Sequence, residues 1–404
     1  MRAAVLAIAI AGTARADPLA LRADAFASTA APAGLLVLSA DGEANGLLSA
    51  EALVWTGDTG ARSGDRADGD VLVIALHART RDHRASGTIG RFVATLGALR
   101  VVQLDGVDGR VRLPHAFELE AYVGIPVEPN LATARTWDWV TGARFSRRFG
   151  DWGSAGVAYM QQRDDGMLAT EELGLDAAAI GERSDVAAKL AYDLANPGLA
   201  QVTATASSRR GAIRGELYAT YMAASHLLPA TSLFTVLGDV PALRVGSTWT
   251  WRAAPRLDVT ADFAMRRSDG DAIDGATPAS SGGERGEVID PAIAVRATLR
   301  LDDRGRGTLG GELRRDGGGD AGWTGARATL RVPLPEAFVA SSELELVIPD
   351  RDRGLGRVWP WGLVALSRAW GPWKAAVAVE AQASPEDRSR VDVLAQLGRA
   401  WSVR

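Results

Sequence analysis

The chain has 404 residues, 47% of them apolar, and a formal net charge of −4 at pH 7. A charge this close to neutral does not favour a nucleic-acid partner. The chain has no cysteine, which excludes disulfides and thiolate metal sites and suits a protein that crosses an oxidising compartment unfolded. It has four histidines and no HExxH motif, so we expect neither a metal nor a cofactor.

The first residues predict a secretory signal peptide. Arg2 precedes an apolar run over residues 3–11, and Ala14-Arg15-Ala16 then supplies the small residues of a cleavage site. The run is too short to cross a bilayer as a helix, which needs about 20 apolar residues. We therefore expect a signal peptide over residues 1–16 and one mature domain over residues 17–404. A buried N-terminal helix is the alternative.

Alternation of apolar and polar residues with a period of two dominates the rest of the chain. Between Leu257 and Met265 every second residue is apolar, and Asp258, Thr260 and Asp262 occupy positions between them. Similar runs recur near residues 244–251, 292–302, 326–332, 343–348 and 390–397. They are about 9 to 13 residues long, close to the length of a tilted transmembrane β-strand.

The connections between these runs are of two kinds. Short ones carry turn residues, as at Gly150-Asp151, Arg210-Gly211 and Gly371-Pro372. Longer ones include residues 128–136, 225–242 and 268–290, and from about residue 97 onward the long ones fall on one side. Long loops opposite tight turns are typical of a membrane barrel. The fold expected is all-β, a transmembrane antiparallel up-and-down β-barrel of about 20 strands, within a range of 18–22.

The size of such a barrel indicates which face meets water. About 20 strands enclose more volume than side chains can fill, so the charged face points inward and the apolar face towards lipid. A soluble propeller would instead show a repeat of about 40 to 50 residues and shorter strands, which the sequence lacks. Tryptophans near proposed strand ends favour a bilayer interface, with ordinary strand-end packing as the alternative. They are Trp55, Trp137, Trp139, Trp152, Trp323, Trp359, Trp361, Trp370, Trp373 and Trp401.

In overall pattern, nearly all of the mature chain resembles Gram-negative outer-membrane β-barrels of the porin type. Locally, Gly90-Arg91-Phe92, Gly97 and Asp105-Gly106-Val107 are similar to a segment of alginate-export-like porins. The resemblance implies a bacterial outer-membrane location, contact with outer-membrane lipid, and insertion by the barrel-insertion machinery. Such barrels usually end on an aromatic residue, whereas here Trp401 precedes three further residues.

Charged residues on the inward phase are the candidate pore lining. A charge on the lipid face near the midplane would cost about 2 to 4 kcal/mol, so we expect these side chains in the lumen. There they would set ion or solute preference, or form cross-strand ion pairs that stabilise the wall, and both roles can coexist. The candidates are Arg79, Arg81, Arg144, Lys189, Glu216, Asp258, Asp262, Arg296, Arg300, Arg327, Arg331, Glu343 and Glu345.

The connection over residues 225–242 is the candidate constriction. Its apolar residues include Leu227, Leu233 and Phe234, too many for a freely solvated loop. We expect it either to fold into the mouth of the barrel or to pack as a cap on neighbouring loops.

No motif supports an enzyme. The run from Gly305 to Gly310 matches GxGxxG but lacks the strand-then-helix context, so it is interpreted as a hairpin turn. The leading hypothesis is a porin-like barrel that allows passive diffusion of small hydrophilic solutes through a charged lumen. The alternative is a non-conducting outer-membrane scaffold or export-complex barrel, with an outer-membrane enzyme third.

Overall fold

The computed structural model describes residues 19–29, 33–44, 47–58, 67–127, 138–227, 241–269, 287–317, 322–350, 358–383 and 389–403. The predicted signal peptide, residues 1–16, lies outside these ranges. No helix among the described residues is long and apolar enough to cross a bilayer.

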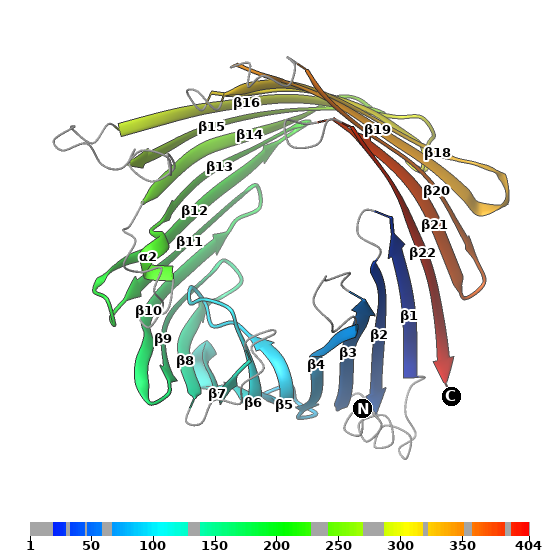
Figure 1. Ribbon diagram of the computed structural model, residues 1–404. Coiled ribbons are helices and arrows are strands. Elements are labelled where there is room, and N and C mark those ends of the chain that lie inside the picture. Colours follow the sequence, from blue (N-terminus) through cyan, green and yellow to red (C-terminus); the bar gives the residue numbers. More distant parts are fainter. Residues whose placement is uncertain are drawn as a thin grey trace, which may run out of the picture.

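The described residues form 22 strands in a single antiparallel sheet, which closes because β1 pairs with both β2 and β22 (Figure 1). This confirms the predicted antiparallel up-and-down barrel of about 20 strands. The strands are β1 (Leu19–Ser28), β2 (Ala33–Ala44), β3 (Leu48–Asp58), β4 (Ala67–Arg79), β5 (Ala85–Ala94), β6 (Val102–Arg112), β7 (Phe117–Pro126), β8 (Trp139–Phe149), β9 (Gly153–Asp164), β10 (Met167–Ile180), β11 (Ser184–Asp193), β12 (Gly198–Arg210), β13 (Ile213–Met222), β14 (Ala242–Ala254), β15 (Leu257–Asp269), β16 (Glu287–Arg300), β17 (Thr308–Asp316), β18 (Trp323–Pro333), β19 (Phe338–Pro349), β20 (Trp359–Trp370), β21 (Trp373–Gln382) and β22 (Arg390–Val403).

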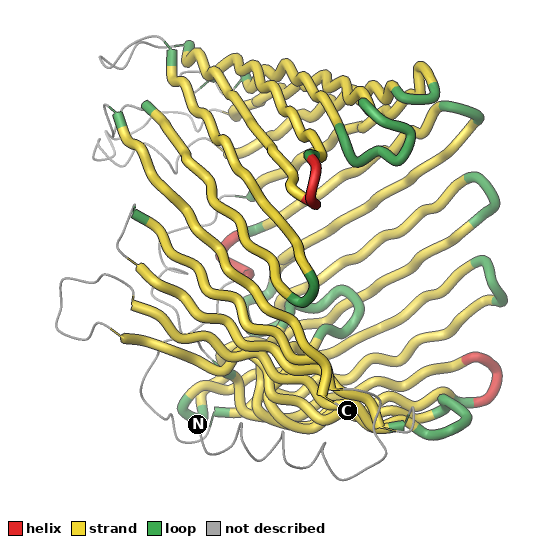
Figure 2. The backbone as a smooth tube through the Cα atoms, turned by 90° about the vertical axis from the view of Figure 1, so that its right-hand side faces the viewer, coloured by secondary structure: helices red, strands yellow, loops and turns green. Residues whose placement is uncertain are grey.

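The strands cross the wall obliquely and define two ends (Figure 2). Connections that follow odd-numbered strands include the longest in the chain, residues 223–241 and 270–286. Connections that follow even-numbered strands are short, as at residues 211–212 and 371–372. We call these the long-loop end and the short-turn end. The chain enters β1 and leaves β22 at the short-turn end, where Leu19 lies opposite Val403.

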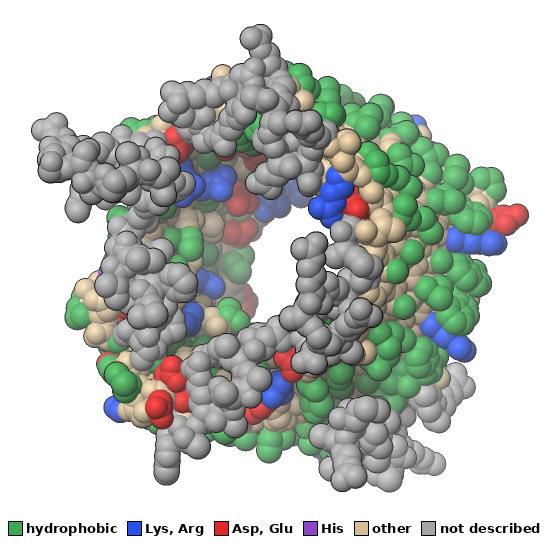
Figure 3. Space-filling view, in the orientation of Figure 1, with side chains coloured by type: hydrophobic (Ala, Val, Ile, Leu, Met, Phe, Trp, Pro, Cys, Tyr) green, Lys and Arg blue, Asp and Glu red, His purple; other side chains and the backbone are tan. Residues whose placement is uncertain are grey.

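Alternation along each strand separates an apolar outer face from a polar lumen. Large apolar side chains of one phase are exposed, such as Ile293 at 52% and Leu344 at 61%. In the space-filling view, hydrophobic side chains (green) cover much of the visible outer surface, and charged side chains (blue and red) border the opening (Figure 3). An exposed apolar surface of this extent needs lipid rather than water around it.

One apolar cluster lies inside the barrel, on the lumen faces of β4 to β9. It forms because the connection between β5 and β6 folds back against the wall instead of continuing outward. The cluster comprises Ala75, Phe92, Ala94, Leu96, Leu99, Val102, Leu104, Tyr122, Val140, Ala158 and Met160.

The GxGxxG run forms a turn that leads into β17, as its missing helix context indicated. Gly305 has a positive φ of 66°, which glycine adopts without strain. The Asp302 carboxylate accepts hydrogen bonds from the backbone N–H of Arg306 at 3.0 Å and of Gly307 at 2.7 Å.

Acidification is expected to loosen this turn. The backbone hydrogen bond from Arg306, assisted by that from Gly307, lowers the pKa of Asp302 below its ordinary value of 3.8. Its contribution to stability is therefore present above that value and is lost as pH falls through the lower pKa of the folded state. Hydrogen–deuterium exchange should show lower protection factors for these two amides under acid. Asp302→Asn should remove that pH dependence, and a wild-type turn equally protected across the range would contradict the prediction.

Candidate functional site

Predicted lumen charges on β15 to β19 form cross-strand contacts. Arg300 pairs with Asp258 at 2.7 Å, Arg296 with Glu312 at 2.7 Å, Arg327 with Glu343 at 2.6 Å and Glu345 with Arg314, while Asp262 accepts from Thr248 at 2.6 Å. Partly exposed pairs of this kind each contribute about 0 to 1 kcal/mol. Most of them connect neighbouring strands, and Arg314 reaches across β18 from β17 to Glu345 on β19. Together they present both signs of charge to the opening.

The other predicted residues are spread around the wall. Arg79 pairs with Glu43 at 2.6 Å, Glu216 lies 3.8 Å from Arg214, Lys189 lies opposite Asp176, and Arg331 lies opposite Thr308. Arg81 differs from the prediction, which placed it on a lumen-facing strand. Strand β4 ends at Arg79, so Arg81 lies in the exposed turn that follows, because the alternating pattern runs past the last paired residue.

Arg144 connects three strands. From β8 it crosses β9 and bonds Asp176 on β10 at 2.7 Å, and it also lies 3.4 Å from Glu120 on β7. The side chain passes over Gly156, where an added Cβ would come within 2.9 Å of its guanidinium nitrogens. Glycine at that lumen position therefore leaves the space that the ion pair occupies.

Residues 95–101, which we call the inner segment, lie against the lumen wall. Leu96 and Leu99 are buried there. Glycines on the wall make room for them, because an added Cβ would lie 2.9 Å from Leu96 at Gly142 and 2.9 Å from Leu99 at Gly174. Gly97 itself has a positive φ of 57°, and a Cβ there would meet Asp176 at 2.2 Å. The close fit shows that the segment belongs to the wall.

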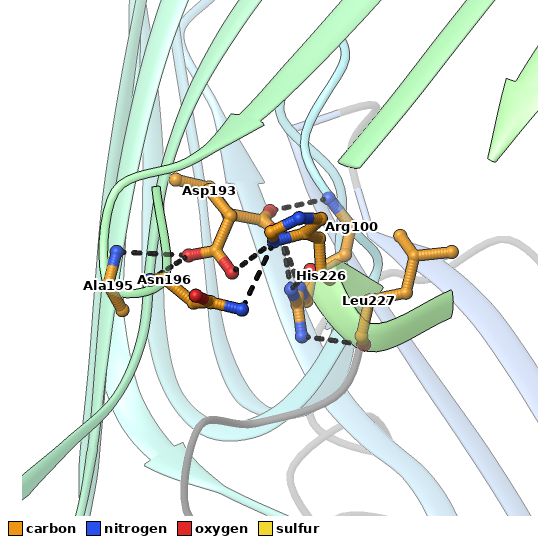
Figure 4. Close-up of polar contacts among 7 residues, drawn as sticks. Arg100, Asp193, Ala195, Asn196, His226 and Leu227 are labelled. Atoms are coloured by element: carbon orange, nitrogen blue, oxygen red, sulfur yellow. Dashed lines mark hydrogen bonds and ion pairs between the residues drawn. The ribbon is translucent and has the colours of Figure 1, made fainter. Parts of the chain in front are cut away.

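An ion pair holds the end of the inner segment. Arg100 Nε donates to Glu172 Oε1 at 2.7 Å, and the Glu172 side chain is 1% exposed. The same guanidinium donates to the carbonyls of His226 at 3.1 Å and Leu227 at 3.0 Å (Figure 4). These two carbonyls belong to α2 (Ala224–Leu227). Arg100 therefore connects the inner segment to β10 and to the start of the connection between β13 and β14.

A second contact holds α2 on the lumen side. His226 Nδ1 lies 3.5 Å from Asp193 and 3.4 Å from the Asn196 side-chain nitrogen (Figure 4). Asp193 also accepts from the backbone N–H groups of Ala195 at 2.9 Å and Asn196 at 3.1 Å. The His226 ring covers Gly198, where a Cβ would approach it to 2.3 Å.

Of the predicted constriction, only residues 225–227 and 241–242 belong to the described part of the chain. Of the loop over residues 225–242, α2 lies against the lumen wall, and residues 228–240 lie outside the described ranges. The sequence reasoning did not identify the inner segment or the Arg100–Glu172 pair. The available signal was Gly97 followed by Leu99 and Arg100, an apolar and charged connection where polar turn residues are usual.

The outer face carries a charge cluster that the sequence did not predict. Arg91 bonds Asp105 through two contacts of 2.8 Å and lies 3.3 Å from Asp70. Arg91 shares the outer phase of β5 with Ile89, which is 57% exposed. The expectation that charges face the lumen fails here because the cluster lies close to the long-loop ends of its strands, where a charge costs about 0 to 1 kcal/mol.

The tryptophans divide between the two faces. Trp361 faces the lumen and donates from Nε1 to Glu380 at 2.7 Å. Trp249 and Trp251 are outward and 51% and 52% exposed towards the short-turn end of β14. Position near a strand end thus does not by itself put a tryptophan against lipid.

No protein-family model matches the chain, and no curated protein matches it in sequence. Solved structures do resemble it. The copper transporter OprC has a TM-score of 0.61 at 10% identity, over 96% of this chain and 81% of that one. The siderophore receptor PirA from Pseudomonas aeruginosa scores 0.58 at 9% identity, over 96% and 80%.

A third similar structure is the F3-3 variant of the FrpB iron transporter from Neisseria meningitidis. It has a TM-score of 0.56 at 9% identity, over 95% of this chain and 82% of that one. These neighbours do not test the local similarity to alginate-export-like porins, which stays a prediction. They are outer-membrane barrels, and at such identities the likeness establishes the fold of this chain, a closed barrel of the same kind.

Proposed function

We propose that this chain is an outer-membrane channel through which small hydrophilic solutes diffuse passively. The observation that carries the proposal is the opening in the described part of the barrel, bordered by charges of both signs and surrounded by an apolar outer face (Figure 3). A lumen lined this way is wetted, and its charges set which solutes pass. The similar structures with transport in their names favour a transporter over an enzyme.

The arrangement of the two ends supports an orientation. In bacterial barrels the short turns face the periplasm and the long loops face outside. We infer that the short-turn end is periplasmic, that the signal peptide over residues 1–16 directs export, and that the barrel-insertion machinery places the chain in outer-membrane lipid.

Two observations favour the alternative, a non-conducting scaffold or export-complex barrel. Many lumen charges are paired across strands, and the inner segment occupies part of the lumen. A wide open pore needs neither feature.

Conductance in a planar lipid bilayer separates the two functions. We expect the purified mature chain, folded in detergent, to migrate faster on a gel before heating than after, and to give stepwise ohmic current. A heat-denatured sample is the control. A folded, heat-modifiable protein that carries no current would favour the scaffold and refute the channel.

A further inference from the structure

A short pattern occurs twice in the chain, each time at a turn of the short-turn end. Residues 113–117 are Leu-Pro-His-Ala-Phe and residues 334–338 are Leu-Pro-Glu-Ala-Phe. Both form a 3-10 turn with positive φ at the same two positions, 61° and 61° in the first and 55° and 61° in the second. The phenylalanine then starts β7 in one copy and β19 in the other.

An arginine follows the phenylalanine of each copy at the same sequence separation, Arg147 after Phe117 and Arg368 after Phe338. The guanidinium of Arg147 on β8 lies 5.1 Å from the Phe117 ring and 5.4 Å from the Phe149 ring. That of Arg368 on β20 lies 4.6 Å from the Phe338 ring and 6.0 Å from the Trp370 ring. The duplicated turn thus positions an arginine between two aromatic rings in both places.

Both arginines belong to the outer face. Arg147 alternates with lumen-facing Ser146 and shares its phase with Phe145, which is 44% exposed. Each lies just before a turn glycine, Gly150 or Gly371. An outward arginine at the edge of an apolar band keeps its stem among apolar side chains and its charged head at the level of the lipid headgroups.

The two copies differ in what neutralises the arginine. Arg368 donates to the Glu336 carboxylate at 3.2 Å and to its backbone carbonyl at 3.1 Å. The corresponding position in the first copy is His115. Among the described residues, no carboxylate contacts Arg147, so its guanidinium edge is available to an outside anion.

We propose that Arg147, between Phe117 and Phe149, binds the phosphate of an anionic phospholipid in the leaflet at the short-turn end. In the second copy, Glu336 excludes that ligand because its carboxylate already pairs with Arg368. A guanidinium matches phosphate oxygens with two parallel N–H bonds, and ring stacking leaves those N–H groups free. The stacked rings would contact the acyl chains beside the headgroup. This proposal rests on the membrane location proposed above.

Native mass spectrometry tests the site on the whole barrel released from detergent containing phosphatidylglycerol. We expect the wild-type protein to retain the lipid and Arg147→Gln to bind it at least ~10-fold more weakly, because a charge-assisted pair to phosphate is lost. Arg368→Gln, the matched control, should retain it as the wild type does. Equal retention by the Arg147 variant, or equal retention of phosphatidylcholine by the wild type, would overturn the proposal.

Exchanging the two turn residues makes the test reciprocal. His115→Glu should supply the carboxylate that the second copy has and abolish retention, whereas Glu336→His should create a second retained lipid. Both positions are exposed and have similar backbone angles, so both variants should keep heat-modifiable migration. Channel current should be unchanged in all of them because neither arginine lines the lumen, so failure here is distinguishable from failure of the channel proposal.

Discussion

Glu172→Gln is expected to release the inner segment from the wall and to raise single-channel conductance. The change removes the charged partner of Arg100 at a site where the carboxylate is 1% exposed and the guanidinium 19% exposed. Removing one partner of such a buried pair costs about 3 to 5 kcal/mol. We expect the lower end, about 3 kcal/mol, because Arg100 keeps two carbonyl acceptors on α2. That shifts the balance between docked and released segment about 100-fold.

The measurement is single-channel current in planar bilayers, with exchange protection of residues 95–101 as the structural readout. Glu343→Gln is the matched control, since it also removes one lumen carboxylate but pairs with Arg327 on the wall away from the segment. The control should keep the wild-type conductance and protection. If both variants behave alike, the conductance reflects lumen charge and the inner segment does not narrow the path.

The alternation that predicted the barrel is a direct consequence of its two faces. On β15 the apolar series that includes Phe263 meets lipid, and the series with Asp258 and Asp262 meets the lumen. Each strand repeats this pattern because side chains alternate between faces whatever their partners are. The architecture and the approximate strand number were therefore predictable from local sequence.

Long-range contacts were not predictable in the same way. Arg100 and Glu172 come together because the wall curves from β6 to β10. The sequence around either residue does not indicate that the other is its partner. Gly142 and Gly174 leave room for leucines that come from another part of the chain. The outward position of Arg91 depends on register and depth in the bilayer, which alternation alone does not give.

A disulfide between Ala98→Cys and Gly174→Cys is expected to restore wild-type conductance to the Glu172→Gln channel. A Cβ added at Gly174 would lie 3.5 Å from the Ala98 Cβ, within the range of about 3.5 to 4.5 Å that disulfides span. The natural chain has no cysteine, so this pair is the sole disulfide that can form. The Leu99 side chain, whose Cδ2 and Cγ would lie 2.9 Å and 3.2 Å from that Cβ, must shift to admit the new side chain.

Oxidised channels should conduct like the wild type, and reductant added to the same bilayer should raise the current to the level of Glu172→Gln alone. Ala98→Cys with Glu172→Gln, lacking the second cysteine, should conduct at the high level with or without reductant. Current that is insensitive to reductant in the disulfide variant, after a mass shift has shown that the bond formed, would mean that movement of the inner segment does not limit flow. The covalent bond replaces the ion pair as the attachment to β10, so it tests attachment separately from charge.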